Sequence, residues 1–224
     1  LGKDTITDLL KPENKARLAK ILKFHVVAGN VPAKTAVTLD SAATIGGQVL
    51  PLEAAGENLT VGGAKVVAAD VAASNGVIHV IDSVMIPGPN LVEVAQKAGS
   101  FGTLLAAAKA AGLAETLADG GPFTVFAPTD AAFDKLGKDT ITDLLKPENK
   151  AKLAAILKFH VVAGNVPAKA AVKLDGAETI GGKKLGLALD GKMLRVGGAE
   201  VVKADVTASN GVIHVIDTVL IPND

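Results

Sequence analysis

The sequence contains no cysteine, tryptophan or tyrosine, so phenylalanine supplies its only aromatic side chains. Without cysteine there is no disulfide framework, no thiolate nucleophile and no cysteine-type zinc site. The scarcity of aromatic rings also argues against a stacking platform for sugars or single-stranded nucleic acid. We therefore look for a function that needs none of these groups.

The chain also has no excess of positive or negative charge, because 23 Lys and Arg residues balance 23 Asp and Glu residues. A neutral chain has no electrostatic reason to bind nucleic acid or an anionic membrane surface. No apolar run reaches the roughly 18 residues that a membrane-spanning helix requires. We expect neither nucleic acid as a partner nor insertion into a membrane.

What is present is a chain of 224 residues, 49% hydrophobic and 21% charged, which is typical of a globular protein with a sizeable core. Its most informative feature is an internal repeat. Residues 1–89 match residues 136–224 at a constant offset of 135, and roughly three quarters of the aligned positions are identical. The differences concentrate in residues 48–60 and 183–195, which we interpret as an exposed hairpin.

Residues 90–135 have no second copy. The repeat therefore predicts an incomplete unit over residues 1–87, which lacks its N-terminal third, and a complete unit over residues 88–224. A single copy of residues 90–135 cannot complete the hydrophobic cores of two units, even by domain swapping between chains. Our hypothesis is that the chain is part of a longer array in which a neighbouring chain supplies the missing segment. The sequence leaves open whether residues 90–135 pack with 136–224 or with 1–87.

Within the complete unit, helical patterns come first and short strands follow, which predicts an α+β fold. We expect Ser100 to cap a helix, and Thr129 or Asp130 to cap another. Residues 159–162 read as a strand, and residues 212–216 as a strand covered on both faces.

Three sequence blocks then resemble the signature blocks of the fasciclin domain. They are Thr124-Val-Phe-Ala-Pro-Thr-Asp-Ala-Ala-Phe133, the Phe159-His160 pair, where tyrosine is more usual at the first position, and Asn210-Gly-Val-Ile-His-Val-Ile-Asp217. The incomplete unit carries the last two of them again. The motif residues are Thr124, Pro128, Thr129, Asp130, Phe133, Phe159, His160, Asn210, Gly211, His214 and Asp217, with Phe24, His25, Asn75, Gly76, His79 and Asp82 in the incomplete unit.

This resemblance implies a wedge of about seven strands with helices packed along one side, repeated in tandem. It also implies secretion or surface display, with the periplasm as an alternative, and a role in adhesion, matrix or biofilm assembly. The implied partners are other copies of the chain or matrix and cell-surface components, in a homo-oligomer or polymer such as a filament or sheet. Some members of the family bind carotenoids, so an apolar ligand, either a carotenoid or a lipid, is the alternative function.

Histidine is the residue type best suited to chemistry here. His160 and His214 could act as a catalytic base or a metal ligand. Each lies in an apolar segment, however, where a hydrogen bond to the backbone is the more common role. On a strand, His214 and Asp217 leave opposite faces and form no dyad. We assign no catalytic residue, metal or cofactor and predict that the protein is not an enzyme; a hydrolase is the least favoured alternative.

Overall fold

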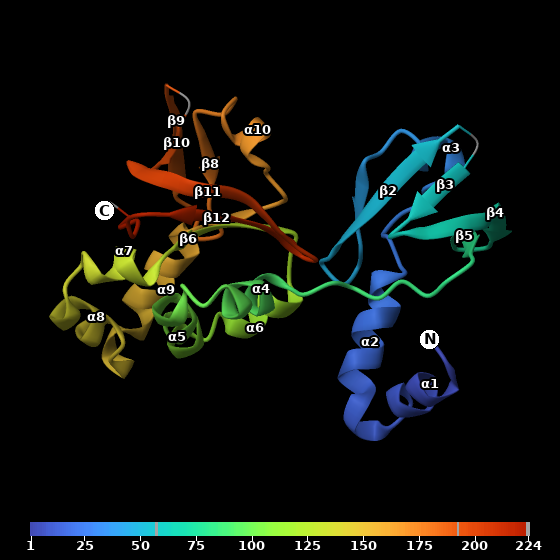
Figure 1. Cartoon of the computed structure of the whole chain (residues 1–224), viewed down its shortest axis with the longest axis horizontal. Helices are drawn as coiled ribbons and strands as arrows, with labels where there is room; N and C mark the ends of the chain where they lie inside the picture. Colours follow the sequence, from blue (N-terminus) through green and yellow to red (C-terminus); the bar gives the residue numbers. More distant parts are fainter. Residues whose placement is uncertain (57, 192, 223–224) are drawn as a thin grey trace. The chain divides into compact units, whose positions relative to one another are not determined.

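The computed structural model describes residues 1–56, 58–191 and 193–222. The chain divides into two compact units, Leu1–Gly88 (unit 1) and Pro89–Asp224 (unit 2), which Figure 1 colours from blue at the N-terminus to red at the C-terminus. Residues 89–135 therefore fold with the segment that follows them, which is the first of the two alternatives. The counterpart of a unit 1 residue is the unit 2 residue 135 positions later in the sequence.

Unit 2 begins with helices and ends with strands. Its helices are α4 (Leu91–Ala98), α5 (Gly102–Ala111), α6 (Ala114–Asp119), α7 (Asp130–Asp134), α8 (Lys138–Leu144), the 3-10 turn η2 (Pro147–Asn149), α9 (Lys150–Phe159) and α10 (Ala168–Ala171). Its strands are β6 (Phe123–Pro128), β7 (Val161–Ala163), β8 (Gly176–Glu178), β9 (Lys184–Asp190), β10 (Met193–Val196), β11 (Ala199–Ala208) and β12 (Gly211–Ile216).

The strands of unit 2 form one seven-stranded sheet in the order β7-β6-β12-β11-β10-β9-β8. Strands β6 and β12 are parallel, and every other neighbouring pair is antiparallel. Helices α4 to α9 lie along one side of this sheet, and α10 lies beside β8 at the other end (Figure 1). The α+β class, the seven strands and the placement of the helices are confirmed.

Strand β12 lies between two apolar clusters. Ile216 belongs to a cluster with Phe126 and Leu185, whereas Ile213 and Val215 face a second cluster beneath the helices. Because alternate side chains of a strand leave opposite faces, a strand that separates two cores is apolar at nearly every position. This explains the continuous apolar run and confirms the predicted two-sided burial.

Within the residues that the structure describes, the elements of unit 1 correspond to those of unit 2 that begin with α8. Its sheet has the order β1-β2-β3-β4-β5. The elements are α1 (Lys3–Leu9), η1 (Pro12–Asn14), α2 (Lys15–Phe24), α3 (Ala33–Ala36), β1 (Ser41–Ala43), β2 (Val49–Ala55), β3 (Asn58–Val61), β4 (Ala64–Ala73) and β5 (Gly76–Ile81). Elements α4 to α7 and β6 have no counterpart there, so β5 is an edge strand, and the segment that corresponds to β7 forms an isolated bridge between Val27 and Thr44 instead of a strand.

The segment that varies between the repeats is a hairpin in both units, β2–β3 and β9–β10. It is exposed on one face alone. Its inward residues Leu50, Leu52 and Leu59 are buried and keep the same identity at their counterparts, so most of the variation lies at outward positions, although the buried Gln48 corresponds to the exposed Lys183. The predicted hairpin is confirmed, with the addition that half of it contributes to the core.

Residues 159–162 do not form one strand, contrary to the sequence prediction. Phe159 is the last residue of α9, His160 is its C-cap, and β7 begins at Val161. The apolar run is shared by a helix end and a strand start because both pack against the same core. His160 thereby occupies a helix terminus and not a strand.

Candidate functional site

His160 is buried at the end of α9, and both of its ring nitrogens are engaged. Nδ1 donates to the carbonyl oxygen of Ile156 at 2.8 Å, and Nε2 accepts from the backbone N–H of Leu220 at 2.9 Å. This pattern requires the neutral ring, with its one proton on Nδ1. Burial lowers the pKa of His160 to about 4, although the bond to Ile156 acts in the opposite direction. The ring joins the helix end to the C-terminal segment.

His214 lies in β12 and is buried as well. Its Nε2 donates to the carbonyl oxygen of Val166 at 2.9 Å, its Nδ1 accepts from the backbone N–H of Asp205 at 3.3 Å, and its ring stacks on Phe126 at a centroid distance of 5.4 Å. Neither nitrogen has a lone pair directed at an open site. In unit 1, His25 and His79 repeat the bonds to a helix carbonyl and to the loop carbonyl of Val31.

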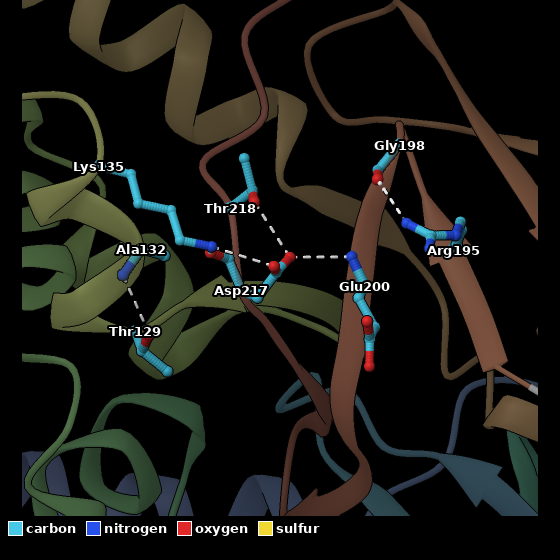
Figure 2. A network of polar contacts seen from close by, with 8 residues as sticks. All are labelled: Thr129, Ala132, Lys135, Arg195, Gly198, Glu200, Asp217 and Thr218. Carbon is cyan, nitrogen blue, oxygen red and sulfur yellow. Dashed lines mark hydrogen bonds and ion pairs between the residues drawn. The ribbon is translucent and has the colours of Figure 1, made fainter.

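Asp217 lies beyond the end of β12 and does not contact His214. Its Oδ1 accepts from the backbone N–H of Glu200 at 2.9 Å and from the hydroxyl of Thr218 at 3.0 Å. Lys135 donates to its Oδ2 at 3.1 Å and to its carbonyl oxygen at 2.7 Å (Figure 2). These donors lower the pKa of Asp217, the Glu200 N–H most strongly. The carboxylate holds strand ends together.

The Thr124–Phe133 block connects β6 to its surroundings. The hydroxyl of Thr124 donates to the Gly164 carbonyl at 2.8 Å and accepts from the Val166 N–H at 2.9 Å. Pro128 is buried at the end of β6, and Phe133 is buried in a cluster with residues of α5 and α9. Thr129 is the N-cap of α7 and accepts from the Ala132 N–H (Figure 2).

Asp130 caps a helix in a different part of the unit. Its carboxylate accepts from the backbone N–H groups of Gly102 at 3.2 Å and Thr103 at 2.7 Å, at the start of α5. These bonds, with the Thr103 N–H first, lower the pKa of Asp130. The N-cap residue of α5 is Phe101, whose side chain makes no capping bond, so the prediction of a cap by Ser100 is wrong.

Asn210 and Gly211 join the sheet of unit 2 to its front segment, residues 89–135. The buried amide of Asn210 accepts from the Leu91 N–H at 2.8 Å and donates to the carbonyl oxygens of Leu117 at 2.8 Å and Gly120 at 2.7 Å. Gly211 has φ +150° and faces the backbone of Phe123, where a Cβ atom would overlap the carbonyl oxygen. Only glycine allows this close approach.

Some of the counterparts of these residues in unit 1 have different surroundings. Phe24 is buried and Asp82 accepts from the Lys65 N–H at 3.0 Å, as Asp217 does from Glu200. Asn75, in contrast, is exposed, and a Cβ atom on Gly76 would have no neighbour within 4 Å. The groups that hold the front segment in unit 2 therefore have nothing to hold in the described part of unit 1.

Both units contain mainly apolar cavities of substantial size, and one of about 650 Å³ lies between α9 and the turn that follows β8 in unit 2. In unit 2, a cavity of about 450 Å³ lies between helices α4, α5 and α6 and strands β6 and β12, with Leu105, Leu117 and Ile213 in its lining. In unit 1, a cavity of about 390 Å³ lies beside β5, with Leu50, Val61 and His79 in its lining.

Sequence reasoning missed two residues that organise unit 2. Phe126 is almost fully buried, stacks on His214 and lies among the side chains of one core cluster. It stands inside the Thr124–Phe133 block, so its position in an apolar strand is the signal that could have identified it. Lys135 binds Asp217 across 82 positions, a range at which no local pattern indicates pairing.

No three His, Asp or Glu side chains converge to form a metal site within residues 1–56, 58–191 and 193–222. In the same part of the chain, no helix is both long and apolar enough to span a membrane.

Comparison with known proteins agrees with this geometry. The Fasciclin domain model matches residues 1–87 and 99–222. Protein sll1483 of Synechocystis sp. is 49% identical over 132 residues, which cover 59% of this chain and 73% of that protein. The transforming growth factor-beta-induced protein ig-h3 of Sus scrofa is 36% identical over 168 residues, which cover 74% of this chain and 24% of that protein.

Among solved structures, a FAS1 domain pair from the insect cell adhesion molecule Fasciclin I superimposes with a TM-score of 0.54 at 21% identity. The match covers 97% of this chain and 83% of that one, and it supports the fold. The family match spans both repeats and includes every motif residue discussed above. The chain belongs to the fasciclin domain family.

Proposed function

We propose that the chain is an extracellular or cell-surface module for adhesion and structural assembly, and that it is not an enzyme. The observation that carries the proposal is membership of the fasciclin family across both repeats, together with a fold shared with a domain pair of a cell adhesion molecule. The secreted location and the partners, either other copies or matrix and cell-surface components, belong to the same proposal.

The absence of an enzymatic role is supported by what the polar groups do. The nitrogens of His160 and His214 bind backbone groups inside the core, and the carboxylates of Asp130 and Asp217 bind backbone N–H groups. A general base needs a lone pair within reach of a substrate proton. Each of these side chains instead stabilises a junction between elements.

A tandem array of such units can increase the avidity of adhesion. Two similar units in one chain present similar surfaces, and linkage can raise the avidity of weak contacts by about 10²- to 10⁴-fold without any new contact. The incomplete unit 1 supports a further step, in which neighbouring chains in a filament, sheet or biofilm matrix share a core. A core shared between chains in this way would require a segment of a neighbouring chain to lie along β5.

A bead assay tests the adhesive function. Microspheres coated with the full chain are expected to bind one another, or surfaces coated with cells or extracellular matrix, more than albumin-coated microspheres do. Diluting the chain on the bead with albumin is expected to reduce binding more steeply than in proportion, because avidity depends on density. Binding equal to that of albumin beads at every density would contradict the proposal.

The cavity of about 450 Å³ in unit 2 favours binding of an apolar ligand as a second candidate function. Its volume lies within the range of about 300 to 1,000 Å³ that is typical of ligand sites, and leucine and alanine side chains dominate its lining. A carotenoid or a lipid has the matching chemistry.

Retinol is a suitable fluorescent probe for this candidate. We expect its emission to rise on addition of the chain, and to rise much less with Leu105→Lys, which places a charge at the cavity. Leu174→Lys is the control, because Leu174 is exposed and does not line this cavity. Equal emission with all three proteins would exclude this cavity as a retinol site.

A further inference from the structure

The cavity of about 650 Å³ in unit 2, called the α9 cavity below, combines an apolar lining with lysine side chains. It is formed by α9, the turn that follows β8, and the stretch that follows β12. It is separate from the cavity of about 450 Å³, because the two have no lining residue in common. The apolar residues of its lining are Ala151, Ala154, Ala155, Ile156, Phe159, Ile180, Ile221 and Pro222.

The charged residues of this lining are all basic. Lys152, Lys158 and Lys183 border the α9 cavity, and no Asp or Glu side chain does so in the part of the chain that the structure describes. Asp143, whose pKa is lowered mainly by Lys146 and to a smaller extent by Lys152, lies outside the lining. Ammonium groups beside an apolar surface favour a ligand that has a negative charge at one end and hydrocarbon elsewhere.

The turn that forms one wall of the α9 cavity is fixed against the helix. The backbone N–H and the hydroxyl of Thr179 both donate to the carbonyl oxygen of Lys183, at 3.0 and 2.8 Å. A Cβ atom on Gly181 would lie 3.3 Å from the Cβ atom of Lys158, so the turn and the helix are in close contact. The wall is therefore already formed before any ligand binds, as is usual for small-molecule sites.

The wall that Ile221 contributes is open in both repeats. Ile221 is 51% exposed. In unit 1 the chain continues past the corresponding Pro87 into unit 2, and the counterpart Ile86 is still 52% exposed. A chain that continues beyond this point thus leaves the isoleucine accessible.

The lining residues differ between the two units at three positions, and the differences move a positive charge. In unit 1 a lysine stands on the helix where unit 2 has alanine, and the turn carries a buried glutamine where unit 2 has an exposed lysine. The α9 cavity therefore has basic residues on both the helix and the turn, with alanine between the two lysines of the helix. The three pairs are Arg17 and Lys152, Lys20 and Ala155, and Gln48 and Lys183.

We propose that the α9 cavity is a binding site for a long-chain fatty acid. The ammonium groups of Lys158 and Lys183 bind the carboxylate, and the alkyl chain covers the alanine residues of α9 and Ile221. The volume lies within the range of about 300 to 1,000 Å³ that is typical of small-molecule sites, which favours one such molecule over a segment of a protein. This site goes beyond the adhesive function and does not depend on it.

A displacement assay on the full chain tests the proposal. We expect cis-parinaric acid, a fluorescent fatty acid, to gain emission when it binds the chain, and palmitate to displace it. Methyl palmitate has the same alkyl chain without the charge. It is expected to compete at least about tenfold more weakly, because the charge-assisted bonds to lysine are lost.

The decisive variant combines Ala155→Lys with Lys183→Gln, which gives the α9 cavity the unit 1 residues at these positions and leaves the net charge unchanged. Because unit 1 accommodates both residues, we expect the variant to fold. Its affinity for parinaric acid is expected to fall by about 100-fold, since a charge now lies on the apolar wall and an ammonium group is missing from the turn. Lys203→Gln removes an exposed charge elsewhere and should leave binding unchanged.

Leu105→Lys alters the other cavity of unit 2 and should also leave this binding unchanged. An absence of parinaric acid binding, or binding that the double variant leaves unchanged, would overturn the proposal. Binding that Leu105→Lys abolishes would overturn it in favour of the other cavity.

Two further competitors distinguish other anionic partners. Displacement by polyglutamate as strong as that by palmitate would overturn the proposal in favour of an acidic peptide. Sedimentation with phosphatidylglycerol vesicles that the double variant abolishes, without binding of free palmitate, would overturn it in favour of a membrane surface. The bead assay is independent of these results, so the fatty-acid site and the adhesive function can fail separately.

Discussion

Asn210 lies where the front segment of unit 2 meets the sheet, and its side chain forms several hydrogen bonds to distant parts of the sequence. Its oxygen accepts from Leu91, 119 positions away, and its NH₂ group donates to two carbonyl oxygens about 90 positions away. A buried amide with every partner in place stabilises the fold, and removing it leaves several buried backbone groups without bonds. Its counterpart Asn75 has the same sequence neighbours and is exposed.

We therefore expect Asn210→Ala to lower the free energy of unfolding of unit 2 by about 3 kcal/mol, whereas Asn75→Ala changes that of unit 1 by less than about 0.5 kcal/mol. Urea unfolding followed by circular dichroism measures both, since the chain has no tryptophan or tyrosine for fluorescence. Equal effects of the two substitutions would mean that the front segment is not anchored by Asn210.

His160 makes the stability of unit 2 depend on pH. Burial lowers its pKa in the folded state from 6.5 to about 4, so between these values the unfolded chain binds more protons than the folded chain. The contribution to stability is complete above about pH 6.5 and is lost as the pH falls towards 4. We expect this to cost unit 2 about 2 to 3 kcal/mol between pH 7 and pH 4.5.

The measurement is urea unfolding of unit 2 by NMR at several pH values, for the unaltered chain and for His160→Gln. The variant is expected to be less stable at pH 7 and to depend less steeply on pH over this range. A parallel pH dependence in both proteins would show that His160 does not cause it.

At the scale of elements, helix α5 begins with a cap that its own sequence does not supply. Asp130, at the start of α7, accepts from the N–H groups of Gly102 and Thr103. A carboxylate at a helix N-terminus satisfies backbone donors and interacts favourably with the helix dipole. The bond therefore connects α5 to the end of β6 as well as stabilising the helix.

We expect Asp130→Ala to reduce the stability of unit 2 by about 1 to 2 kcal/mol. Asp134→Ala, in the same helix and at an exposed position, is the control and should change it by less than about 0.5 kcal/mol. Because the folded pKa of Asp130 is lowered, its stabilising effect is present above the unfolded pKa near 3.8 and is lost below it. The difference between Asp130→Ala and the unaltered chain should therefore shrink at acid pH in thermal unfolding by circular dichroism.

The distance along the sequence between two interacting residues explains which features could be predicted from the sequence. Helix α4 carries its own boundary signals, because Asn90 caps it and Gly99 ends it within the same segment. Strand β12 was recognisable from its own apolar run. The cap from Asp130 and the anchor from Asn210 join distant segments, and no local pattern encodes such pairs. The Phe159–Val162 run was misread because helix ends and strands that face one core carry the same apolar residues.

At the scale of the whole molecule, one chain contains two related units, and residues 89–135 belong to unit 2. Unit 2 has a seven-stranded sheet with helices along one side, whereas unit 1 has five strands and an open edge at β5 within the described residues. The repeat thus provides an internal control that few proteins offer. At positions where the two repeats are identical, a difference in exposure arises from the surroundings and not from the residue type.

Hydrogen exchange uses this control most directly. The segments 74–82 and 209–217 are identical, so their intrinsic exchange rates are equal and any difference arises from structure. Amides of β12 bond to a strand on either side, whereas β5 pairs with β4 alone in the part of the chain that the structure describes. We expect alternate amides of β5 to exchange at least about 100-fold faster than their counterparts in β12. Peptide fragments that extend to Ser83 and Thr218 differ in mass, so mass spectrometry can distinguish them.

The exchange of the other strands of unit 1 separates two causes of fast exchange in β5. If the unpaired edge of β5 is the cause, fast exchange is confined to β5, and the amides of β2 and β3 remain protected. If the whole core of unit 1 opens, the amides of β2 and β3 exchange as fast as those of β5. Fast exchange confined to β5 therefore indicates an edge strand on a folded unit, whereas equal protection of β5 and β12 would contradict the expected difference.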